Sequence, residues 1–137
     1  MTRNLIDTNI LISAALFPES VPARAYMKAV SPPYEAVVCE HSLDEMRRVF
    51  NRKFPHRIAD YERFLSMLTL SVEIVPTPPE GASKDESDES KIRDIDDRPI
   101  FRAAVAAKVD AIITGDKDFL DSGIECPKML KAVEFLG

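Results

Sequence analysis

The chain has 137 residues, of which 45% are hydrophobic and 30% charged, and its formal net charge is −5. This composition is typical of a globular protein, and the length suits a single domain over residues 1–137. No run of about 18 apolar residues occurs, so we expect no segment to span a membrane. A strand is predicted within a few residues of Met1, and the two cysteines lack metal-ligand spacing. We therefore expect a cytoplasmic protein without a signal peptide.

The net charge of the chain is concentrated in one segment. Residues 80–97 hold eight acids and three bases, which accounts for the whole net charge of −5. Residues 46–58, in contrast, contain no acid and have five bases: Arg47, Arg48, Arg52, Lys53 and Arg57. A partner that carries phosphates is therefore compatible with the acidic composition, provided that the two segments lie apart.

Short apolar runs that suit buried strands alternate with helical patterns along the chain. The predicted strands are 3–6, 36–38, 72–75, 111–113 and 128–130. The predicted helices are 10–16, 21–30, 43–50, 58–68 and 97–108, followed by two short ones that begin at 119 and 133. This alternation predicts an α/β fold, here a three-layer α/β/α sandwich with a central parallel sheet of about five strands.

Local patterns refine this prediction. Ser42, with Glu45 three residues later, matches a capping box, so a helix is expected to begin just after Ser42. Residues 51–56 form a polar break after that helix. Residues 76–96 are rich in proline, serine and acids, which predicts a mobile loop. Asn4 is a polar residue within the first strand, where a buried parallel strand favours apolar residues.

Four carboxylates are expected to gather at one edge of this sheet. Asp7 follows the first strand and Asp116 the fourth, and ligands of open α/β sheets bind outside the carboxyl ends of the strands. Glu45 lies in the first turn of the helix after the second strand, and Asp97 opens the helix before the fourth. Such acids repel one another unless a cation is bound. Mg²⁺ binds both carboxylates and phosphates, so the pattern indicates hydrolysis of a phosphodiester.

Each of these acids also has a purely structural explanation. Asp7 or Thr8 can cap the first helix, and Glu45 can do no more than close the capping box. Asp97 can be an N-cap, and Asp116 lies in a glycine-containing turn, where aspartate is common.

Other candidate residues are interpreted as structural. Asp94, Asp96 and most acids of residues 85–89 are predicted to be solvated loop charges. Cys39 is interpreted as a small core residue, since acids rather than bases surround it in the sequence. His41 and His56 have no partner at ligand spacing, which favours surface or structural roles for both.

Four motifs, in order, resemble those of PIN domains, and the closest likeness is to the VapC-type toxin ribonucleases. They are Asp7-Thr8-Asn9 with Ser13, Leu43-x-Glu45-x-x-x-Val49, Asp94-x-x-Asp97-Arg98-Pro99-Ile100 and Thr114-Gly115-Asp116-Lys117-Asp118-Phe119. The resemblance covers residues 3–136, and the order and spacing of the four motifs make it specific, although each motif is weak alone. The long acidic loop before Asp97 departs from the family pattern and bears on substrate access.

The resemblance implies roles for particular residues. The metal-holding positions for Mg²⁺ or Mn²⁺ are occupied by Asp7, Glu45, Asp97 and Asp116. The polar supporting positions are occupied by Asn9, Ser13 and Thr114, and Asp118 matches an acid of variable involvement. The implied activity is metal-dependent cleavage within RNA by a toxin, often held in check by a small antitoxin protein, and members of the family commonly form homodimers.

Two other functions are compatible with the sequence. A non-catalytic PIN-like domain would bind a protein partner, but the presence of all four acids argues against it. A metal-dependent phosphatase of small substrates would fit Asp7-Thr8-Asn9 loosely, although that pattern wants a second aspartate where Asn9 stands. For a ribonuclease, clustered acids repel phosphates, so the RNA-binding surface is predicted at the basic run of residues 47–57 listed above.

Overall fold

The computed structural model describes residues 2–81 and 86–137. Its central sheet has five strands in the order β3-β2-β1-β4-β5, and each neighbouring pair is parallel. The strands are β1 Arg3–Ile6, β2 Glu35–Cys39, β3 Glu73–Val75, β4 Ala111–Ile113 and β5 Lys128–Leu130. The predicted parallel sheet is therefore confirmed, and each strand lies within two residues of its predicted bounds.

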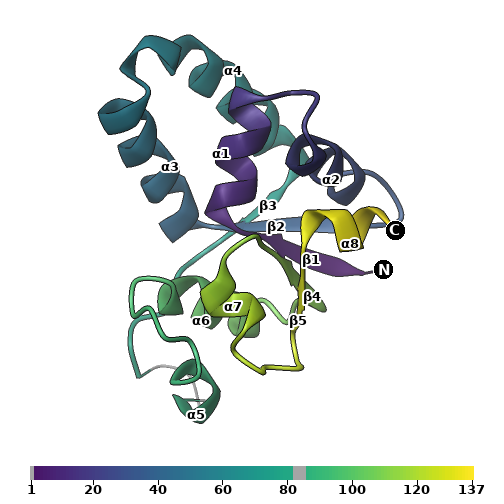
Figure 1. Ribbon diagram of the computed structural model, residues 1–137, viewed down its shortest axis with the longest axis vertical. Coiled ribbons are helices and arrows are strands. Elements are labelled where there is room, and N and C mark those ends of the chain that lie inside the picture. Colours follow the sequence, from purple (N-terminus) through teal and green to yellow (C-terminus); the bar gives the residue numbers. More distant parts are fainter. Residues whose placement is uncertain (1, 82–85) are drawn as a thin grey trace.

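Helices cover both faces of this sheet, which gives the predicted three layers (Figure 1). One face carries α1 Thr8–Leu16, α2 Val21–Ala29, α3 Glu40–Lys53, α4 Ile58–Ser71 and α8 Ala132–Leu136. The other face carries α6 Arg98–Ala106 and α7 Lys117–Leu120, with the short α5 Glu86–Glu89 beyond α6. A single 3₁₀ turn, η1 Pro55–Arg57, joins α3 to α4. No helix in residues 2–81 and 86–137 is long and apolar enough to cross a membrane.

Alternation along the strands supplies the two cores between the layers. Ile6 and Val38 point toward the five-helix layer, whereas Leu5 and Val37 point toward α6 and α7, because successive strand residues face opposite sides. All four side chains are fully buried. Asn4 is also buried, at 1% exposure, so the polar residue in β1 does not reach solvent. The sheet thus holds the carboxyl ends of β1 and β4 rigidly beside one another.

The start of α3 differs from the prediction. The helix begins at Glu40, directly after β2, with Cys39 as its N-cap and no side-chain capping bond. Ser42 is consequently a buried residue within the first turn, so the predicted capping box of Ser42 and Glu45 is wrong. The reason is that β2 runs into the helix without a connecting loop. The predicted break at 51–56 is also wrong in part, since α3 continues to Lys53.

Part of the predicted mobile loop is packed against the protein. Residues 82–85 lie outside the described residues, but Ile92 is completely buried in the α6 core. Glu89 is 7% exposed and forms an ion pair with Arg102 of α6, so it is an exception among the acids of 85–89, most of which were predicted to be solvated. Arg98 Nε donates to the carbonyl of Ile92 at 3.0 Å. These contacts fix the approach of the chain to Asp97.

Candidate active site

Asp7 lies at the junction of β1 and α1 and is 3% exposed. Its backbone N–H donates to the carbonyl of Ile113 at 3.0 Å, which continues the pairing of β1 with β4. Its Oδ1 accepts from the N–H of Thr8 at 2.7 Å, and its Oδ2 accepts from Thr114 Oγ1 at 2.7 Å. Asp7 is therefore both the cap of α1 and a site residue, so the two interpretations of this residue do not exclude each other.

The end of β4 places the second carboxylate beside the first strand. Thr114 follows β4 and is fully buried, and its Oγ1 also accepts from the N–H of Asp116 at 3.0 Å. Asp116 caps α7, where its Oδ1 accepts from the N–H of Asp118 at 2.8 Å. The hydroxyl of Thr114 thus links Asp7 and Asp116, which follow two adjacent strands.

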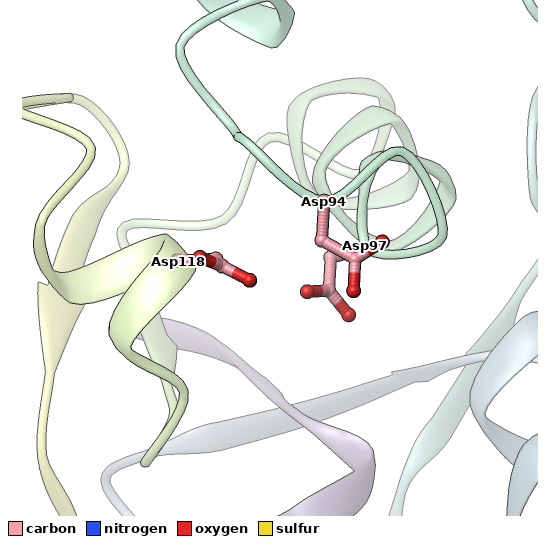
Figure 2. Close-up of side chains that lie close together, drawn as sticks. All are labelled: Asp94, Asp97 and Asp118. Atoms are coloured by element: carbon pink, nitrogen blue, oxygen red, sulfur yellow. The ribbon is translucent and has the colours of Figure 1, made fainter.

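Three aspartates converge where α6 begins opposite α7. Asp97 occupies the N-cap position of α6, but its side chain makes no capping bond. One carboxylate oxygen from each of Asp94, Asp97 and Asp118 lies within 4.8 Å of the others, and Figure 2 shows the three side chains directed toward one another. Asp94 was predicted to be a solvated loop charge. Asp94 is indeed exposed in a loop, and a turn from Asp94 to Asp97 also brings its carboxylate into the cluster.

Glu45 lies on the α3 side of the site and is held by a residue that the sequence assigned only to capping. Thr8 is 4% exposed, and its Oγ1 donates to Glu45 Oε1 at 2.7 Å. The same hydroxyl lies 2.9 Å from Ser42 Oγ. His41 Nε2 is 3.7 Å from Glu45 Oε1. Its spacing of four residues before Glu45, on one helical face, was the signal in the sequence for this contact.

Crowding of buried carboxylates raises the pKa of two of them. Burial raises the pKa of Asp7 to about 6, opposed by the bonds from Thr114 and Thr8. Burial raises the pKa of Asp97 to about 8, and the neighbouring carboxylates of Asp116, Asp7 and Asp94 add to this shift. These interactions place Asp7, Asp97 and Asp116 in one electrostatic cluster. The charge of Glu45 also raises the pKa of Asp7, to a smaller extent, so Glu45 belongs to the same cluster.

The other two predicted supporting residues lie on α1. Asn9 is exposed in the first turn, two residues after Asp7, and Ser13 is half-buried one turn further on. Within residues 2–81 and 86–137, neither side chain makes a hydrogen bond. Their supporting roles remain predictions from the family resemblance.

The basic run divides into two parts. Arg47, Arg48, Arg52 and Lys53 are exposed on α3. Arg57 instead donates to the carbonyl of Leu16 at 2.9 Å and forms an ion pair with Asp60, so it joins η1 to α1. Glu45, Arg48 and Arg52 line one cleft of about 280 Å³ together with His41, Val49 and Asp96. Two of the cations therefore lie beside the acidic site, whereas Arg57 is committed elsewhere.

The site residues fit a hard divalent cation. The donor atoms are carboxylate oxygens, which Mg²⁺ and Mn²⁺ prefer. Asp97 Oδ2 is buried and has no hydrogen-bond partner among the residues that the structure describes. A buried carboxylate oxygen without a donor is unfavourable, and a bound cation would satisfy it.

The fold and the site together define a class of protein, namely a parallel α/β domain with a carboxylate-rich site at the carboxyl edge of its sheet. The chain belongs to the PIN domain family, whose family model matches residues 3–118. No curated protein sequence matches the chain.

Solved structures share the fold over almost the whole chain. A chain of VapBC2 from Rickettsia felis, solved bound to a DNA fragment from the promoter, aligns with a TM-score of 0.65 at 15% identity. The alignment covers 95% of this chain and 98% of that one. VapC20 of Mycobacterium tuberculosis, a toxin that cleaves the sarcin-ricin loop, aligns with a TM-score of 0.62 at 18% identity. That alignment covers 88% of this chain and 95% of the VapC20 chain.

Proposed function

We propose that the protein is a metal-dependent endoribonuclease of the VapC type, the toxin of a toxin–antitoxin pair. The observation that carries this proposal is the convergence of carboxylates from three separate parts of the chain at one sheet edge. Asp7 follows β1, Asp116 and Asp118 flank the start of α7, and Asp94 and Asp97 precede α6. Structural acids rarely gather in this way, because their mutual repulsion destabilises the fold.

The residues proposed to hold Mg²⁺ or Mn²⁺ are Asp7, Glu45, Asp97 and Asp116, with Asp94 and Asp118 as neighbours. A divalent ion supplies an activated water and stabilises charge on a phosphodiester. Thr114 and Thr8 contribute by orientation, since each is buried and donates to one site carboxylate. The carboxylates are therefore preorganised for one geometry.

Cations beside the acids favour a substrate made of phosphates. Arg48 and Arg52 share the cleft with Glu45, so a strand that enters the site would pass along α3. Arg47 and Lys53 extend the same exposed surface. VapC20 is a toxin that cleaves an RNA loop, which supports RNA as the substrate of this chain. The structure from Rickettsia felis is of a VapBC complex, which supports a small antitoxin as partner. A homodimer and a cytoplasmic location belong to the same proposal.

The activity is tested by cleavage of RNA in the presence of Mn²⁺. We expect cleavage by the wild-type protein, its loss on addition of a chelator, and its recovery with Mn²⁺. Asp7→Asn keeps the shape of the side chain and its Oδ1 acceptor, so folding should be retained while cleavage falls by about a hundredfold or more. Asp121→Asn, at an exposed position after α7, is the matched control and should behave as wild type. Chelator-resistant cleavage, or full activity of Asp7→Asn, would contradict the proposal.

The path of the RNA is tested by the salt dependence of binding. Each phosphate contact on a single strand contributes roughly −0.7 to the slope of log affinity against log salt. In a cleavage-deficient Asp7→Asn background, changing Arg48 and Arg52 to Ala should flatten the slope by about 1.4. Arg63→Ala removes an exposed cation of α4 and should leave the slope unchanged. Equal slopes for all three proteins would place the RNA away from α3.

A further inference from the structure

Arg93 contacts the carboxylate cluster from the same segment that carries Asp94. Its guanidinium lies 2.8 Å from Asp118 Oδ1, and the side chain of Arg93 is 86% exposed whereas that of Asp118 is 14% exposed. Within residues 2–81 and 86–137, this is the only ion pair that any of the five clustered aspartates makes (Asp7, Asp94, Asp97, Asp116 and Asp118). Arg93 is therefore a solvent-facing cation that pairs directly with the aspartate cluster.

The position of Arg93 is fixed by its neighbours in the chain. Ile92, which precedes it, is completely buried, and the carbonyl of Ile92 accepts from Arg98. Asp94, which follows it, lies in the cluster and accepts from the N–H of Asp97 through its own carbonyl at 3.1 Å. The backbone on both sides is held, so the fold keeps the Cα of Arg93 within reach of Asp118.

We propose that Arg93 is an internal cation that competes with the divalent ion for the Asp118 carboxylate. Asp118 has a carboxylate oxygen within 4.8 Å of those of Asp94 and Asp97, so an ion held between these groups would draw on the carboxylate that Arg93 now binds. Because Arg93 directly precedes the turn from Asp94 to Asp97, which carries two of these carboxylates, its local concentration at the site is high. Its effect is to weaken divalent-ion binding and so to set the metal concentration at which the site fills. The inference rests on the proposed divalent-ion site but not on the identity of the RNA.

The inference is tested by calorimetric titration of the metal-free protein with Mn²⁺ alone. Arg93→Gln removes the charge and keeps a polar side chain, and we expect its Mn²⁺ affinity to be tighter than that of wild type by roughly 1.4- to fivefold, the range expected for an exposed ion pair. Arg63→Gln is the matched control, because Arg63 is likewise an exposed arginine paired with an aspartate, Asp60, away from the site. Its Mn²⁺ affinity should equal that of wild type.

A double-mutant cycle identifies the carboxylate involved. Asp118→Asn should weaken Mn²⁺ binding, and in that background Arg93→Gln should no longer tighten it. Unchanged affinity of Arg93→Gln, or equal tightening with and without Asp118, would overturn the inference. A protein that binds Mn²⁺ with the expected Arg93 effect but cuts no RNA would overturn only the proposed function. If the wild-type protein cuts RNA with Mn²⁺ but the Arg93→Gln variant binds Mn²⁺ with wild-type affinity, only the proposed role of Arg93 is overturned.

Discussion

Replacing Asp97 by Asn should lower RNA cleavage by about a hundredfold or more and, at the same time, raise the thermal stability of the metal-free protein at pH 8. The two effects have one origin. Burial and three neighbouring carboxylates raise the pKa of Asp97 to about 8, so its charged form is unfavourable in the folded state without a cation. Asparagine has the same shape and no charge. It therefore relieves the repulsion while removing a proposed metal ligand.

The measurement is a thermal melt of the metal-free protein beside a Mn²⁺ titration. Wild type should gain stability on addition of Mn²⁺, and Asp97→Asn should gain little, because the free energy of metal binding adds to that of folding. Asp121→Asn, which is exposed, controls for the loss of one negative charge and should leave both quantities unchanged. A less stable Asp97→Asn protein would show that this carboxylate supports the fold, as a structural N-cap would.

The stability of the metal-free protein should fall as pH rises from about 5 to about 8. The pKa values of Asp7 and Asp97 are raised to about 6 and about 8, above the ordinary value of 3.8 that applies in the unfolded chain. Within this window the folded protein holds more protons than the unfolded chain, so removing protons favours unfolding. For the buried Asp7, a shift of roughly two units corresponds to at most about 3 kcal/mol. Deprotonation of Asp97 lowers the stability further over the upper part of this pH range.

Chemical denaturation at several pH values, in chelator and in saturating Mn²⁺, measures this dependence. The fall should be present in chelator and reduced in Mn²⁺, since a bound cation stabilises the deprotonated carboxylates. The double variant with Asp7→Asn and Asp97→Asn should also show a flatter profile, which separates these two groups from the histidines. Stability that is constant or rises over this range in chelator would contradict the raised pKa values.

The sequence left open purely structural roles for the acidic residues, and particular contacts in the structure argue against them. A purely structural role for Asp97 predicted a side-chain cap of α6, and no such bond is present. A purely structural role for Glu45 required the capping box, which is absent because α3 begins at Glu40. Asp7 and Asp116 do cap helices, but their remaining oxygens face the cluster or its threonine support. These observations support the catalytic proposal over an interaction domain that merely keeps the fold.

The sequence by itself determined the layers of the fold and the strand-end acids. Short, mostly apolar segments of three or four residues predicted all five strands, because strands in the middle of a parallel sheet are buried on both faces. Asp7 directly follows one of those strands, and Asp116 comes three residues after the end of another. Parallel strands end at the same edge, so their position in the site followed from chain order alone.

Only the tertiary structure decided which further groups join that edge. Asp94 enters the cluster, Thr8 binds Glu45 across 37 positions of sequence, and Arg93, in the segment before α6, reaches Asp118 of α7. Arg57 leaves the proposed RNA surface because it is bonded to the carbonyl of Leu16. Each of these contacts joins segments whose relative placement depends on how helices pack on the sheet. A local pattern of charge or capping residues carries no information about that packing, so these partners could be assigned only once the layers were assembled.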